Sequence, residues 1–153
     1  MDQTLTDAPM PDLALQAPDG GTGTLHALRG GQGAVVYFHR SAGCPVCASH
    51  ARALVAMRDA GELGDRALVL VVPGGPEEAA VVARRHPGAP AVRASGTAHA
   101  EVGLGTFLAL QHSGVFLVEA DGTVAYRRGA AVPLRSFDEA ELRAALRASD
   151  GRA

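Results

Sequence analysis

Lysine is absent from this 153-residue sequence, so every basic residue other than histidine is an arginine. The 14 arginines are balanced by 16 acidic residues, which gives a formal net charge of −2 at pH 7. A chain that binds nucleic acid or an anionic membrane through its charge normally carries a clear basic excess. The near-neutral balance therefore predicts neither partner.

Long apolar runs are also missing. A helix that spans a bilayer needs about 20 consecutive apolar residues, and no stretch of this chain approaches that length. Residues 1–13 (MDQTLTDAPMPDL) are acidic and lack the apolar segment of a secretory signal. We therefore expect a cytoplasmic protein that does not associate with membranes.

Cysteine is scarce, and the spacing of the only two cysteines is informative. Cys44 and Cys47 form a C-x-x-C motif, which is typical of redox chemistry or metal binding, and structural disulfides are rare in a reducing cytosol. A structural zinc ion needs about four ligands, and only His39 and His50 lie near the pair in the sequence. Redox chemistry without a metal or other cofactor is the favoured interpretation.

Apolar runs and turn signals predict alternating strands and helices. The expected strands cover residues 13–17, 34–39, 67–72, 91–93 and 115–118, and the expected helices cover residues 44–60, 76–85 and 97–102. Asp121-Gly122 predicts a hairpin leading into a strand at 123–128. The spacing of Ser136 and Glu139 indicates a capping box at the start of a C-terminal helix.

This order of elements predicts an α/β fold. Right-handed crossovers place successive strands side by side and parallel, with helices on both faces, and the hairpin adds antiparallel strands at one edge. Residues 1–12 are polar and contain two prolines, so we expect a flexible N-terminal arm. Residues 13–153 contain no linker and no internal repeat, which indicates a single domain.

Several of these segments together resemble the thioredoxin superfamily, in particular its redoxin branch of AhpC/TSA proteins (peroxiredoxins) and their relatives. The resemblance is carried by Ala8-Pro9 with Leu13, Leu15, Asp19-Gly20 and Leu28-Arg29-Gly30, by residues 35–38 followed by Gly43-Cys44-Pro45-Val46-Cys47, by residues 68–72, and by residues 114–118 with Asp121-Gly122-Thr123-Val124. It implies a thioredoxin-like fold, with a central mixed β-sheet flanked by helices, for the domain at 13–153.

The sequence departs from the redoxin pattern at two positions. Peroxiredoxins place a proline and a threonine or serine ahead of the reactive cysteine. Ser41 matches the second of these, whereas Tyr37 stands in the place of the proline. Ser113, beside His112, stands where peroxiredoxins carry an arginine.

A helix N-terminus and nearby cations lower the pKa of a cysteine thiol and make it reactive. Cys44 is expected at such a terminus, so we predict that it is the exposed, attacking residue and that Cys47, one turn further on, is the resolving residue. Pro45 suits the first helical turn. The residues expected to support the reaction are Arg40, His39, Ser41, Pro45, His112 and Ser113.

Three functions remain open at this point. The first hypothesis is reduction of disulfides, the second is reduction of peroxides with Cys44 peroxidatic, and the third is a non-catalytic redox sensor or metal-binding module. The expected partners are a disulfide or peroxide substrate and a thiol reductant of the thioredoxin or glutathione type. The resemblance to redoxins also suggests a homodimer.

Overall fold

Runs of aliphatic residues form the centre of the sheet. A computed structural model describes residues 7–29, 31–87, 91–107 and 110–152. Strands β3 (Ala34–Phe38), β4 (Ala67–Val72) and β5 (Ala91–Ala94) are parallel neighbours, and β3 and β4 are almost wholly buried. Continuous apolar strands of this kind are typical of a sheet that is covered on both faces.

Antiparallel strands extend both sides of this parallel centre. Strand β8 (Ser113–Val118) pairs with β3, and β9 (Val124–Ala130) pairs with β8. On the other side β1 (Ala14–Gln16) pairs with β5, and β2 (Thr22–Thr24) forms the edge. The resulting order is β2-β1-β5-β4-β3-β8-β9, and β6 (Thr106–Phe107) and β7 (Leu110–Gln111) form a separate ribbon.

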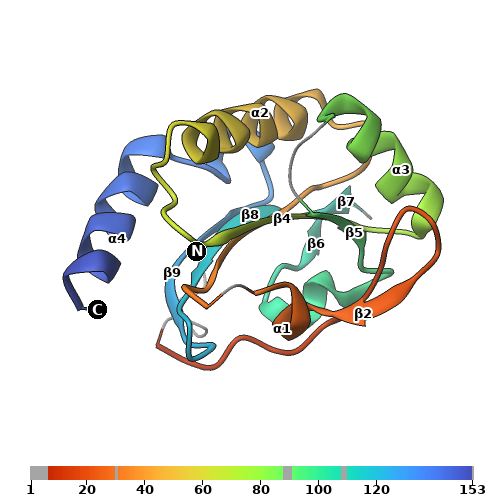
Figure 1. Ribbon diagram of the computed structural model, residues 1–153. Helices are drawn as coiled ribbons and strands as arrows, with labels where there is room; N and C mark the ends of the chain where they lie inside the picture. Colours follow the sequence, from red (N-terminus) through yellow and green to blue (C-terminus); the bar gives the residue numbers. More distant parts are fainter. Residues whose placement is uncertain (1–6, 30, 88–90, 108–109, 153) are drawn as a thin grey trace.

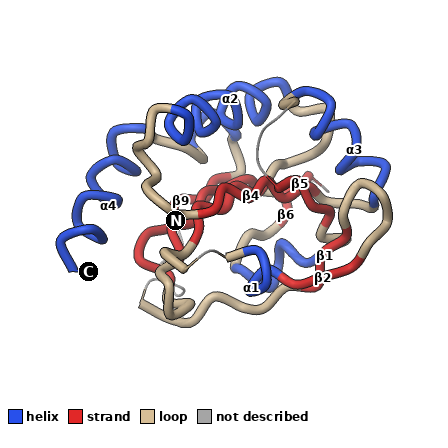
Figure 2. Tube along the Cα trace, in the orientation of Figure 1, coloured by secondary structure: helices blue, strands red, loops and turns tan. Residues whose placement is uncertain are grey.

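Helices cover the two faces of the sheet unequally. Helices α2 (Pro45–Asp59), α3 (Pro76–Arg85) and α4 (Glu139–Arg152) lie together over one face (Figures 1 and 2). The short helix α1 (Leu25–Leu28) lies on the opposite side of the sheet, where the core also contains Val102 from the 3-10 helix η1 (Ala98–Val102). A second 3-10 helix, η2 (Pro133–Arg135), precedes α4.

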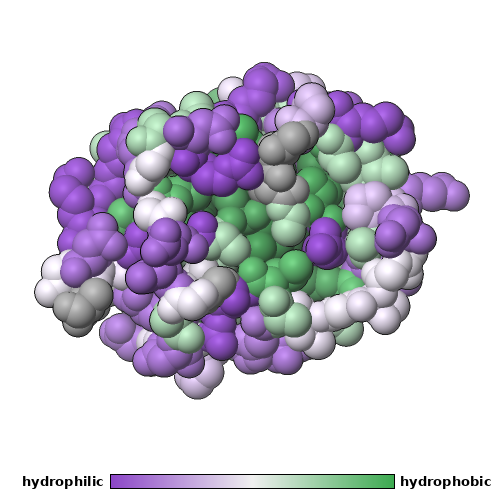
Figure 3. All heavy atoms as spheres, in the orientation of Figure 1, coloured by the Kyte–Doolittle hydropathy of each residue, from purple (hydrophilic) through white to green (hydrophobic). Residues whose placement is uncertain are grey.

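The sheet therefore separates two apolar cores. The core under α2, α3 and α4 contains both cysteines, and the second core contains Met10, Leu13 and Leu25. In the space-filling view, hydrophobic residues are seen in the middle of the displayed face and hydrophilic residues form most of its rim (Figure 3). Burial of these apolar side chains is the main term that stabilises the layers.

Most of the predicted elements are confirmed, including the α/β fold with a mixed sheet flanked by helices. The expected helix at 76–85 coincides with α3, and the Asp121-Gly122 hairpin joins β8 to β9. The order of the strands differs at the start of the chain, because β1 lies beyond β5 and not beside β3. The expected helix at 97–102 is a 3-10 helix.

The predicted capping box at Ser136 is wrong. The carboxylate of Asp138 accepts the hydrogen bond from the Glu141 N–H (2.9 Å), so Asp138 caps α4. The Ser136 hydroxyl instead donates to the Pro133 carbonyl and lies 3.3 Å from the Tyr37 hydroxyl. Ser136 therefore belongs to a buried polar cluster beside the sheet.

Residues 7–12, the described part of the expected arm, run along the β8–β9 hairpin. The N–H groups of Asp7 and Met10 donate to the carbonyls of Val124 and Gly122, and Met10 is buried. The expected arm at 1–12 is therefore attached to the sheet through these residues. Residues 1–6 lie outside the described part of the chain. No helix in the described residues is long and apolar enough to cross a membrane.

A tight turn at Gly33 leads directly into β3. Gly33 has a φ of +96°, and a Cβ at this position would overlap the Val118 carbonyl oxygen and the Glu119 backbone. We predict that Gly33→Ala lowers the free energy of unfolding by about 2–4 kcal/mol, because it adds left-handed strain to a backbone overlap. Urea unfolding measures this difference.

Gly31→Ala is the matched control for Gly33→Ala. Gly31 lies in the same turn, and a Cβ there meets nothing within 4 Å. The control should therefore unfold within about 0.5 kcal/mol of the unsubstituted protein. Equal effects of the two substitutions would contradict the role assigned to Gly33.

Candidate active site

The end of β3 and the start of α2 position the two cysteines. β3 ends at Phe38, and the chain then turns so that the Cys44 N–H donates to the Ser41 carbonyl (3.3 Å). Cys44 is the N-cap residue of α2, and Pro45 occupies the first turn, where its missing N–H leaves no hydrogen bond unmade. The predicted placement of the C-x-x-C motif at a helix N-terminus is confirmed.

The structure shows Cys44 and Cys47 joined in a disulfide, with their Cα atoms 5.2 Å apart. Two main-chain donors point at the sulfur atoms. The Cys47 N–H lies 3.2 Å from the Cys44 sulfur, and the Arg40 N–H lies 3.4 Å from the Cys47 sulfur. In the reduced protein, such donors favour a thiolate over a thiol, because they interact more strongly with a charged sulfur.

The expected exposure of Cys44 is wrong for this oxidised form. Cys44 is only 2% exposed and Cys47 is fully buried. Both belong to the core beneath α2, which also contains Tyr37 and Ala51. Solvent therefore has almost no access to Cys44 in the oxidised protein.

Arg40 and Ser41, between β3 and α2, contact the two cysteines mainly through their backbones. Arg40 donates its N–H to a sulfur and Ser41 accepts the Cys44 N–H. No hydrogen bond from the Ser41 hydroxyl to either sulfur is present in the described residues. The Arg40 guanidinium makes no hydrogen bond or ion pair there, and its Nε is buried without a partner. Within the described residues, the Arg40 side chain therefore has no acidic partner.

His39 does not supply a positive charge. The side chain is 2% exposed, and neither ring nitrogen has a hydrogen-bond partner. Burial lowers the pKa of His39 to about 3, and repulsion from His86 contributes. His39 is therefore a neutral ring at physiological pH, packed edge-on against Tyr37 with ring centroids 5.1 Å apart.

Tyr37, which stands where the redoxin pattern has a proline, organises a polar cluster on the same face of the sheet as the disulfide. Its hydroxyl lies 2.9 Å from His50 Nδ1 and 3.3 Å from the Ser136 hydroxyl. Burial raises the pKa of Tyr37 to about 12, so its hydroxyl remains protonated. The sequence spacing gave no sign that Ser136, 99 residues away, completes this cluster.

The structure places the expected supporting residues Ser113 and His112 in different surroundings. Ser113 is fully buried and shares its face with Val115, the partner of Tyr37 across β3 and β8. His112 precedes this strand and lines a separate cavity with Arg127 and Leu104. Ser113 therefore lies on the face that carries the disulfide, whereas His112 lines a cavity that contains neither cysteine.

Two arginines beside Cys44 were missed by the sequence analysis. Arg52 on α2 and Arg85 on α3 line a cavity of about 400 Å³ together with Gly43, Pro45 and Ala48. The Arg85 guanidinium donates to the Ala42 carbonyl (2.6 Å), two residues before Cys44. Arg52 could have been found from its place five residues after Cys47 in the same predicted helix. No local pattern in the sequence places Arg85 near the motif.

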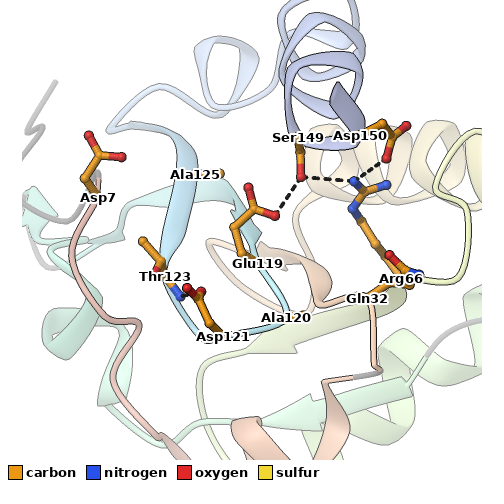
Figure 4. Close-up of a pocket in the computed structure, with 10 residues that line it drawn as sticks. All are labelled: Asp7, Gln32, Arg66, Glu119, Ala120, Asp121, Thr123, Ala125, Ser149 and Asp150. Atoms are coloured by element: carbon orange, nitrogen blue, oxygen red, sulfur yellow. Dashed lines mark hydrogen bonds and ion pairs between the residues drawn. The ribbon is translucent and has the colours of Figure 1, made fainter. Parts of the chain in front are cut away.

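A larger cavity of about 500 Å³ lies at the other end of the sheet (Figure 4). It is lined by Gln32 and Arg66, which precede β3 and β4, whereas the disulfide follows the far end of β3. The Arg66 guanidinium bonds to Asp150 (2.7 Å) and Ser149 (3.1 Å), and Ser149 donates to Glu119 (2.6 Å). This network ties α4 to the sheet and is not part of the redox site. Within the described residues, no group of three His, Cys, Asp or Glu side chains is placed to hold a metal ion.

Comparisons with known proteins agree with this geometry. The model of the AhpC/TSA family matches residues 6–127. The chain belongs to the AhpC/TSA family. A search of the curated proteins found no match. Membership of this family makes the chain an enzyme of the thiol peroxidase and oxidoreductase type, in the redoxin branch of the thioredoxin superfamily.

Solved structures share the fold at low sequence identity. Reduced Prx3 from Vibrio vulnificus in complex with H2O2 is 17% identical, with a TM-score of 0.76 over 92% of this chain and 97% of that one. Peroxidoxin BcpB from Mycobacterium tuberculosis is 19% identical, with a TM-score of 0.74 over 94% and 96%. A thiol peroxidase from Chromobacterium violaceum is 16% identical, with a TM-score of 0.70 over 97% and 89%. These likenesses confirm the predicted thioredoxin-like fold.

The buried histidines of this AhpC/TSA protein predict a loss of stability in acid. Burial lowers the pKa of His39 to about 3 and that of His99 to about 4, from an ordinary value of 6.5. The unfolded chain therefore binds more protons below pH 6.5, and stability falls as the pH drops from 6.5 towards these folded values. We expect each histidine to cost about 2 kcal/mol at pH 5 relative to pH 7.5.

Urea unfolding at several pH values between 5 and 7.5 measures this slope. His39→Leu replaces one titrating ring with an apolar side chain of similar size. The free energy of unfolding of this variant should therefore fall less steeply with decreasing pH. A slope as steep as that of the unsubstituted protein would show that His39 does not contribute.

Proposed function

We propose that this AhpC/TSA protein is a thiol peroxidase in which Cys44 attacks the peroxide and Cys47 resolves the product. The observation that carries the proposal is the placement of the Cys44 sulfur at the N-terminus of α2, where it accepts the Cys47 N–H and bonds to Cys47. The family match supports peroxide as the oxidant.

The reaction has two chemical steps on the protein. The Cys44 thiolate attacks the terminal oxygen of the hydroperoxide and the O–O bond breaks, so that Cys44 becomes a sulfenic acid. The departing alkoxide or hydroxide takes one proton from solvent and leaves as an alcohol or water. The Cys47 thiol then displaces the sulfenic oxygen as water and forms the Cys44–Cys47 disulfide. An external thiol reductant returns the pair to its reduced form with two electrons.

The remaining expectations about partners and location extend this proposal. Reduction of a C-x-x-C disulfide suits a donor of the thioredoxin or glutathione type, which is abundant in a reducing cytosol. We therefore infer a cytoplasmic protein. A homodimer is part of the same proposal, and light scattering of the purified protein tests it.

Reduction of disulfides is the second candidate function. The observation that favours it is the pair of departures at Tyr37 and Ser113, since both stand where the redoxin pattern has peroxide-activating residues. The same cysteines would act, with Cys44 attacking a substrate disulfide and Cys47 releasing the mixed disulfide.

Rapid-quench reaction of the reduced protein with hydrogen peroxide distinguishes these functions. The chain has no tryptophan, so the products are followed by mass spectrometry. We expect Cys44 to oxidise orders of magnitude faster than a free thiol. Cys44→Ser should lower the rate constant at least about a thousandfold, because the attacking atom is gone.

Cys47→Ser is the matched variant. It should retain fast oxidation but accumulate the Cys44 sulfenic acid, since the resolving thiol is missing. Peroxide reaction no faster than that of free cysteine, together with rapid exchange with small disulfides, would overturn the peroxidase proposal in favour of the second candidate.

A further inference from the structure

The cavity beside Cys44 has a positively charged wall. Gly43 and Pro45, the chain neighbours of Cys44, line it, and Ala48 lies one turn further along α2. Arg52 reaches it from α2 and Arg85 from α3. Cys44 itself is only 2% exposed, so the cavity borders it through its two chain neighbours.

The charges of Arg52 and Arg85 are not neutralised by the protein. In the described residues neither guanidinium forms an ion pair, and the hydrogen bond of Arg85 goes to the neutral Ala42 carbonyl (2.6 Å). Burial lowers the pKa of the neighbouring His86, and both arginines lower it further, which places their charges close to the same buried ring. Two unpaired cations therefore act on one small cavity.

The N-terminus of α2 adds to this field. α2 has 15 residues, so its first turn carries the positive end of a full helix dipole. The positive end of the dipole favours an anion at this end of the helix, and guanidinium groups bind carboxylates through charge-assisted hydrogen bonds. The acidic residues of the described chain contribute none of the side chains that line this cavity.

We propose that Arg52 and Arg85 form a binding site for carboxylate-bearing molecules that react at Cys44. The inference rests on the proposed function, because it names the substrate class of the same site. The carboxylate can belong to an organic hydroperoxide that oxidises Cys44 or to a small thiol that reduces the disulfide. Both present an anionic group beside a reacting oxygen or sulfur.

Alkylation of the reduced protein tests the charge preference without any peroxidase activity. Iodoacetate and iodoacetamide differ by one negative charge and share a leaving group. In a Cys47→Ser background, the ratio of their rate constants at Cys44 measures the preference for an anion. Changes in the intrinsic reactivity of Cys44 alter both rates alike and cancel in this ratio.

We expect Arg52→Gln and Arg85→Gln each to lower the iodoacetate to iodoacetamide ratio about threefold at low ionic strength, and the double variant about tenfold. Arg85→Lys keeps the charge and should retain most of the ratio. Arg84→Gln is the matched control, because Arg84 is an exposed neighbour on α3 that does not line the cavity. The control should leave the ratio unchanged.

Two further pairs identify the natural source of the carboxylate. p-Carboxycumene hydroperoxide against its methyl ester tests an acidic peroxide, and glutathione against its diethyl ester tests an acidic reductant. A preference for the acid that is lost in the double variant assigns the site to that reaction. The proposal is overturned if the alkylation ratio is the same in the double variant, or if Arg84→Gln lowers it equally. Slow reaction with every peroxide, alongside a normal alkylation ratio, would instead reject only the peroxidase function.

Discussion

The hydrogen bond from the Cys47 N–H to the Cys44 sulfur exists because α2 begins one residue after Cys44. That start is fixed by two features that the chain cannot easily change. β3 is buried along its whole length and ends at Phe38, and Pro45 can only occupy the first turn of a helix. The positions of the Cys44 sulfur, its main-chain donor and its disulfide partner all follow from this junction of strand and helix.

Electrostatics at the site come from arginine and the helix, not from histidine. Burial keeps His39 neutral, and it also lowers the pKa of His50 and His86. Arginine stays charged in any protein environment because its pKa is so high. The cations near the motif are therefore arginines: Arg40 precedes it in the chain, and Arg52 and Arg85 line the cavity beside it.

The sheet keeps the redox chemistry apart from the polar network at its other end. Because β3 and β4 are parallel, their carboxyl ends lie at the same end of the sheet, and the disulfide follows β3 there. The buried Arg66 lies directly before β4, at the opposite end of the strands, where it joins α4 to the sheet through Ser149 and Asp150. The network that joins α4 to the sheet and the Cys44–Cys47 disulfide therefore lie at opposite ends of the strands.

Local signals in the sequence were enough for the central strands, the helix that starts at Pro45, the hairpin at Asp121-Gly122 and the position of the C-x-x-C motif, but not for β2, β6 and β7. Each predicted feature depends on residues that are near one another along the chain, as periodicity and turn chemistry do. The sequence did not reveal the burial of Cys44, the neutral state of His39, the Tyr37–Ser136 contact or the approach of Arg85 to Ala42. Those features depend on which distant segments the sheet and helices bring together, so only the tertiary structure decided them.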